Sequence, residues 1–199
     1  MEKQINRLVQ TCHYHRQNIG SIRKVLTKDA IATLVWTLIL SRLDYCKSSL
    51  FGISSSQLHR LHKIQNKAAR IITLTSPRCH TYPILKSLHW LRIRERTDFK
   101  ILCLTYQSFY NSGPSYLQDL LTHYSPERTL RTSQRLLLAV PSYNLKSFGF
   151  FTTFSYAAAS LWNCLPVEFR SSLSLSTFKS RLKTHLFLRY TWRITICTY

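Results

Sequence analysis

Apolar residues recur every three to four positions over most of the first 110 residues, which is the pattern of helices that bury one face. The first such stretch runs from Glu2 to Leu26, and Gly20 is expected to interrupt it. A second stretch begins after Thr27 or Asp29, either of which is a suitable N-cap. Because this second helix is apolar almost all round, we expect it to be central and buried.

A third stretch combines an apolar stripe with a stripe of cations. Ser55 or Ser56 is a suitable N-cap, and the apolar stripe then consists of Leu61, Ile64, Ala68 and Ile71. The cations have the same spacing on another side of the helix, here called the basic face: Arg60, Lys63, Lys67 and Arg70. Taken alone, this face is more simply interpreted as a solvated surface than as a binding site. A connection of only a few residues makes this helix and the preceding one antiparallel neighbours.

A further helix is expected after Pro77 and Pro83, with an apolar face that extends from Ile93 to Tyr110. Cations cluster around its start: Arg92, Arg94, Arg96 and Lys100. Since cations at the N-terminal end oppose the helix dipole, their position favours a role toward a partner.

The Gly113-Pro114 pair marks the clearest break in composition. Beyond it, short apolar pieces at 136–140 and 148–154 are compatible with strands or with irregular segments packed on helices. Helices are expected at 157–163 and at 177–188, the second one capped by Ser176.

These patterns predict a mostly α fold. A helical bundle would occupy residues 1–112, and a smaller mixed or irregular C-terminal segment with a terminal helix would occupy residues 113–189. The tail at 190–199 is β-branched and aromatic and fits no helical pattern.

Charge changes the interpretation of the basic face. The chain of 199 residues carries 28 Lys and Arg against 8 Asp and Glu, a formal net charge of +20. Such an imbalance is typical of proteins with a polyanionic partner: nucleic acid first, an anionic membrane second and an acidic protein third. The longest apolar run is about half of the ~20 residues that a membrane-spanning helix needs, and no signal peptide is evident. We therefore expect an intracellular chain, cytoplasmic or nuclear, without a membrane span.

Catalytic chemistry finds little support in the sequence. No two carboxylates are placed to hold a pair of metal ions, and no glycine-rich loop is present to cradle a phosphate. The six cysteines are scattered, so reduced thiols are favoured over zinc ligands, and no sequence context selects one Cys–His pair. We expect no catalytic residue, no metal and no cofactor. The four tryptophans are expected in the core, with base stacking as the alternative.

Several blocks, taken together and in order, resemble the region downstream of the catalytic palm in reverse transcriptases of non-LTR retrotransposons, of the jockey-like and chicken-repeat-like lineages. The blocks are Ser41-Arg42-Leu43-Asp44-Tyr45-Cys46, Leu61 to Arg70, Leu88-His89-Trp90-Leu91, Ile93 to Arg96, Gly113 to Leu117, Ser160 to Pro166 and Phe178 to Lys183. They cover most of the chain up to about Leu188.

The resemblance implies a helical thumb and a C-terminal segment without the catalytic aspartates of the palm. It implies sequence-independent binding of the backbone of RNA, of an RNA–DNA hybrid or of a DNA duplex, and contact with a palm or fingers portion of a polymerase. The basic face and the cations from Arg92 to Lys100 are the residues expected to bind. The alternatives are a translated relic without a specific partner and a basic protein that binds the membrane surface.

Overall fold

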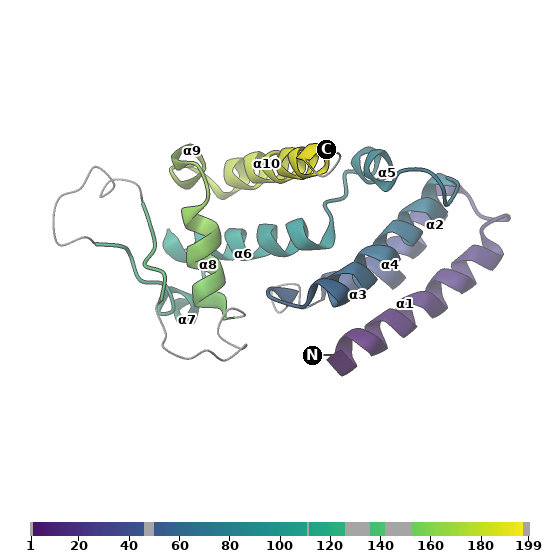
Figure 1. Ribbon diagram of the computed structural model, residues 1–199, viewed down its shortest axis with the longest axis horizontal. Helices are drawn as coiled ribbons and strands as arrows, with labels where there is room; N and C mark the ends of the chain where they lie inside the picture. The colour runs from purple at the N-terminus through teal and green to yellow at the C-terminus, as the bar shows by residue number, and fades with distance from the viewer. Residues whose placement is uncertain (1, 46–49, 111, 126–135, 142–152, 197–199) are drawn as a thin grey trace. The chain divides into compact units, whose positions relative to one another are not determined.

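The computed structural model describes residues 2–45, 50–110, 112–125, 136–141 and 153–196, without the side chains of 190–196. This part of the chain is mostly helical, as predicted (Figure 1). Contacts group the chain into two compact units, residues 1–96 and 97–199. The sequence-based division after residue 112 stays a prediction, while the contacts group most of the helix that precedes it with the second unit.

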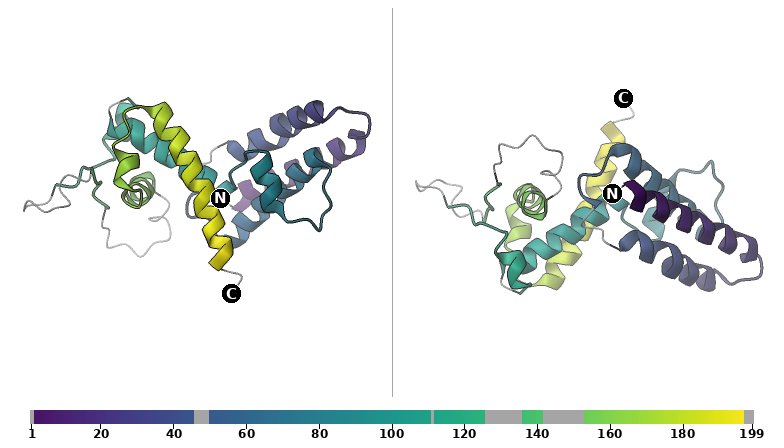
Figure 2. Two further views of the ribbon diagram at one scale, coloured as in Figure 1. Left: turned by 90° about the horizontal axis from the view of Figure 1, so that it is seen from above. Right: turned by 90° about the horizontal axis from the view of Figure 1, so that it is seen from below.

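Three helical segments pack side by side in the first unit (Figure 2). Arg60 contacts Asn6, and Lys67 acts electrostatically on His13, so the first and third segments run in the same direction. The middle segment runs the opposite way, which gives an up–down–up arrangement. Its elements are α1 (Glu2–Ile22), α2 (Lys28–Val35), the π-helical turn η1 (Trp36–Leu40), α3 (Ser41–Asp44), α4 (Ser55–Thr73), α5 (Thr81–Ser87) and the first turn of α6 (Ile93–Phe109).

The core of this unit lies between the three segments. Ala68 and Ala69 of α4 are fully buried, and their small side chains allow neighbouring helices to approach closely. The other buried residues include Ile5, Val9, Cys12 and Ile19 from α1, Ile31, Val35, Ile39, Leu40 and Leu43 from the middle segment, and Leu61, Ile64, Ile71 and Ile72 from α4.

The π-helical turn maintains the buried side of the middle segment. The Ser41 backbone N–H donates to the Trp36 carbonyl, five residues back, instead of the usual four. This wider turn lets Val35 and Leu40 occupy the same buried side and leaves Trp36 half exposed. Both the expectation that this helix is central and buried and the expectation that the tryptophans lie in the core are therefore wrong at Trp36.

Helix ends differ from expectation by one or two residues. Thr27 does cap α2, because the Ala30 N–H donates to its hydroxyl at 3.3 Å. The cap of α4 is Ser54 instead of Ser55 or Ser56, since the backbone is still extended at Ser54 and its hydroxyl accepts from the Gln57 N–H. Gly20 does not interrupt α1.

The second unit is built around aromatic side chains. Its elements are the remainder of α6 with α7 (Ser115–Gln118), α8 (Phe154–Asn163), α9 (Val167–Arg170) and α10 (Leu175–Ile196). Tyr106 stacks on Phe178 with ring centroids 4.5 Å apart, and Phe109 stacks on Trp162 at 5.2 Å. The Tyr106 hydroxyl also donates to the Ser172 carbonyl at 2.7 Å, which anchors the segment between α9 and α10 to α6.

The apolar piece at 136–140 is an irregular segment, one of the two expected alternatives. Leu138 forms a single antiparallel bridge with His123 and is bound on its other side by Asn163. The Leu138 N–H donates to Asn163 Oδ1 at 3.0 Å, and Asn163 Nδ2 donates to the Leu138 carbonyl at 2.8 Å. The companion piece at 148–154 lies almost entirely outside the described residues.

The expectation that the tail is not helical is wrong for residues 190–196, because α10 continues to Ile196. Extending an existing helix costs little compared with nucleating one, so weak helix formers can follow a well-anchored helix. The N-cap of α10 is Ser174, not Ser176: its hydroxyl accepts from the Thr177 N–H at 3.2 Å.

Candidate nucleic-acid interface

The basic face of α4 is exposed to solvent along its middle. Lys63 and Lys67 are exposed and make no hydrogen bond to any other described residue. The four cations span roughly 80° of the helix circumference, at ~100° per residue. Because α4 contains no Asp or Glu, nothing on the helix itself neutralises this charge.

Helix α1 borders the basic face on one side. Arg60 Nη1 donates to Asn6 Oδ1 at 2.6 Å, which fixes the guanidinium against α1. Farther along, burial lowers the pKa of His13, and the charges of Lys67 and Arg16 lower it further. Because the charge of Lys67 affects the pKa of His13, the two side chains lie near each other. His13 and Arg16 of α1 therefore extend the polar surface beside the basic face.

The segment that leads into α6 borders the other side. Gln65 is fully buried, and its Nε2 donates to the Leu91 carbonyl at 2.7 Å, which fastens this segment to α4. Burial, together with the charges of Arg92, His59 and Arg94, lowers the pKa of His62 to about 4. The charges of Arg92 and Arg94 therefore act on α4 at His62, which lies roughly 80° around the helix from Arg70, the nearest cation of the basic face.

Not all of the expected residues contribute in the same way. Arg70 donates from Nη2 to the Cys79 carbonyl at 3.0 Å and so braces the turn that follows α4. Arg96 donates from Nη2 to Asp44 Oδ2 at 2.8 Å and is largely buried. Lys100 is exposed, but it belongs to the second unit. Arg60, Lys63 and Lys67 thus share one face of α4, and the charges of Arg92 and Arg94 act on His62 of the same helix.

Sequence reasoning missed the polar residues beside these cations. His62 and His59 lie on α4, and Asn6, His13 and Arg16 lie on α1. The spacing of His13 and Arg16, three residues apart on the polar side of a helix, was the available signal. The histidines are not evident from the sequence in this role, because neutral side chains add nothing to a charge count.

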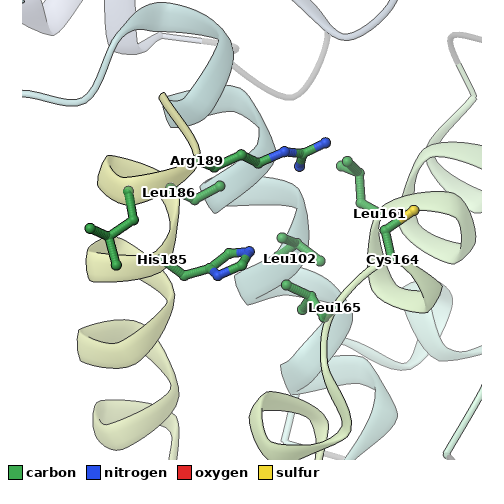
Figure 3. Close-up of a pocket in the computed structure, with 8 residues that line it drawn as sticks. Leu102, Leu161, Cys164, Leu165, His185, Leu186 and Arg189 are labelled. Carbon is green, nitrogen blue, oxygen red and sulfur yellow. The ribbon is translucent and has the colours of Figure 1, made fainter. Parts of the chain in front are cut away.

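A cavity of about 480 Å³ occupies the second unit (Figure 3). Its wall is mainly leucine, and Figure 3 shows His185 and Arg189 projecting from α10 toward the side of the cavity that carries Cys164, the residue after α8. Burial lowers the pKa of His185, and Arg189 adds to this effect. No hydrogen bond between Cys164 and His185 exists in the described structure, so this pair lacks the contact through which a base activates a thiol.

Two of the other described cysteines offer little reactivity. Cys12 and Cys103 are buried free thiols, and burial raises the pKa of each to about 11. Within the described residues, no group of three or more His, Cys, Asp or Glu side chains is arranged to hold a metal ion.

A search of the described helices finds none that is both long enough and apolar enough to span a bilayer. Comparisons of the chain with protein-family models, with curated proteins and with solved structures found no match.

Proposed function

We propose that this chain is a thumb-like fragment of a non-LTR retrotransposon reverse transcriptase that binds the sugar–phosphate backbone of nucleic acid without reading its sequence. The observation that carries the proposal is the basic face of α4, where Lys63 and Lys67 are exposed and no acidic residue on the helix offsets them.

The arrangement suits a backbone ligand better than a point anion. The cations lie in a row along α4, and the charges of Arg92 and Arg94 act on His62 of the same helix. A row of cations can follow a phosphate backbone, whereas base edges are read by directed donors and acceptors. The two exposed residues in the middle of this face are lysines, and the guanidinium groups of Arg60 and Arg70 already donate to Asn6 and to the Cys79 carbonyl. Binding is therefore expected to be independent of sequence.

Binding of this kind depends steeply on salt. Each phosphate that a cation neutralises releases counterions, and affinity falls with a log–log slope of roughly −0.7 to −0.9 per contact. The double variant Lys63→Gln/Lys67→Gln should reduce the slope by about 1.5 and weaken binding at low salt. Folding should survive, because both side chains are exposed.

The test is a filter-binding titration on an RNA–DNA hybrid, an RNA duplex and a DNA duplex, each at several salt concentrations. Lys179→Gln/Lys183→Gln is the matched control, since these exposed lysines have the same four-residue spacing on α10. A chain that does not bind at low salt, or binds without salt dependence, contradicts the proposal. Equal losses from the two double variants would show that net charge, not the basic face, is responsible.

A further inference from the structure

Trp36 differs from the other described tryptophans in its exposure. Half of its surface, 50%, is accessible to solvent, whereas Trp90 is 9% exposed and Trp162 is fully buried. The reason lies in η1, where the wider π-helical turn directs Ile39 and Leu40 into the core and leaves the first residue of the turn outside. Such turns occur frequently at functional sites.

The indole of Trp36 is supported on its inner side. The Trp36 ring centroid lies 6.5 Å from that of the buried Trp90. The guanidinium carbon of Arg96 lies 5.9 Å from the same Trp36 centroid. Arg96 is held in turn by Asp44 at 2.8 Å. A ring that is already held in place by its neighbours loses little conformational entropy when a second ring stacks on it.

The same segment that supports Trp36 also borders the basic face. The Arg96 N–H donates to the Arg92 carbonyl at 2.8 Å, so the two side chains are four residues apart on one side of the helix. Arg92 lowers the pKa of His62 on α4, while Arg96 lies over Trp36. To reach the indole, a nucleic acid on the basic face would have to continue past His62 and along Arg92 and Arg96.

We infer that Trp36 is a stacking platform for an unpaired nucleobase of the nucleic acid whose backbone lies on the basic face. This inference rests on the proposed function and adds a preference for single-stranded segments, because a base inside a duplex is stacked on both faces and has no open face for an indole. Positive charge beside the ring favours a nucleic acid over an apolar protein segment. Arg96, which is paired with Asp44 and lies 5.9 Å from the ring centroid, supplies that charge from the start of α6.

The test compares a blunt RNA–DNA hybrid with the same hybrid carrying a short single-stranded extension. We expect the extended hybrid to bind more tightly and to quench tryptophan emission. The variant Trp36→Leu should lower affinity for the extended hybrid roughly fivefold or more, in line with base stacking on aromatic side chains, and leave the blunt hybrid unaffected. Trp36→Phe should retain part of the affinity and lose the quenching that belongs to Trp36.

The controls separate this inference from the proposed function. Trp36→Leu should keep the wild-type salt slope, whereas Lys63→Gln/Lys67→Gln should reduce it on both substrates. If salt-dependent binding persists but wild type and Trp36→Leu bind both hybrids alike, the stacking platform is wrong and the backbone site stands. A change only in self-association, measured by sedimentation, would identify Trp36 as a protein contact instead. Absence of salt-dependent binding overturns both proposals.

Discussion

The cations on α4 differ in what their side chains contact within the protein. Arg60 and Arg70 at the two ends donate to Asn6 and to the Cys79 carbonyl, whereas Lys63 and Lys67 between them extend into solvent. The planar guanidinium presents several donors in fixed directions, which suits it to bracing a loop while it still carries charge. A lysine ammonium remains hydrated and can adjust to a phosphate.

Arg70 is therefore expected to contribute more to stability than to binding. Arg70→Gln removes a charged donor from the Cys79 carbonyl and should lower the free energy of unfolding by roughly 1–2 kcal/mol. Lys63→Gln should change that free energy by less than about 0.5 kcal/mol. Urea unfolding followed by circular dichroism measures both. Equal stabilities of the two variants would show that the Arg70 contact contributes nothing net.

His62 links the stability of the first unit to pH. Its pKa is about 4 in the folded chain against an ordinary value of 6.5, because burial and the nearby Arg92 disfavour the charged form. The unfolded chain thus binds a proton more readily between these two values. The stability that neutral His62 provides is complete above about pH 6.5 and is lost as the pH falls toward 4.

As the pH falls from 6.5 to 4, protonation of His62 should lower the free energy of unfolding by roughly 2–3 kcal/mol. Urea unfolding of the wild type and of His62→Gln between pH 7 and pH 4 tests it. The pH dependence should be shallower in the variant, and a remainder should persist because the pKa values of His13 and His185 are also lowered. Superimposable profiles would contradict the assignment.

At the scale of single elements, Asn163 replaces strand pairing for the segment around Leu138. Leu138 is 2% exposed, so its backbone groups have no water to replace the two hydrogen bonds from the Asn163 amide. Asn163→Leu should lower the free energy of unfolding by roughly 2–4 kcal/mol. The reason is that the Leu138 N–H and carbonyl would both lose their partner, and a buried backbone group without a hydrogen bond costs about 1–3 kcal/mol. Chemical denaturation provides the measurement. Asn18→Ala, at an exposed position of α1, serves as the control and should differ little from wild type.

Periodicity predicted the helices well because burial repeats along them. Leu61, Ile64 and Ala68 are all buried, as the apolar stripe required. The same rule failed at Trp36, because a π-helical turn inserts a residue that no three-to-four spacing anticipates. It failed again at the tail, where low helix propensity was outweighed by the continuation of α10.

The candidate site was predictable in position but not in the state of its side chains. Exposed cations at helical spacing identified Lys63 and Lys67 directly. The internal bonds of Arg60, Arg70 and Arg96 depend on Asn6, on the Cys79 carbonyl and on Asp44, which are distant in sequence or lie in the backbone. Only the fold brings such acceptors within reach.

At the scale of the whole molecule, the net charge of +20 should give salt two opposite effects. Repulsion among the cations destabilises the folded chain, and salt weakens it as the Debye length falls from roughly 30 Å at 0.01 M to about 10 Å at 0.1 M. The melting temperature of the unliganded chain should therefore rise over this range. Affinity for an RNA–DNA hybrid should fall over the same range, because salt reduces the gain from counterion release.

These opposite responses distinguish a folded binder from a translated relic. A binder should melt cooperatively, and at low salt the hybrid should raise its melting temperature, since a ligand that prefers the folded state stabilises it. This stabilisation should shrink as salt increases and should be smaller in Lys63→Gln/Lys67→Gln than in Lys179→Gln/Lys183→Gln. Differential scanning calorimetry with and without the hybrid measures both the cooperativity of melting and the shift in melting temperature. A broad, non-cooperative melt that the hybrid leaves unchanged at low salt would favour the relic, because a chain without a defined fold has no organised basic face to present.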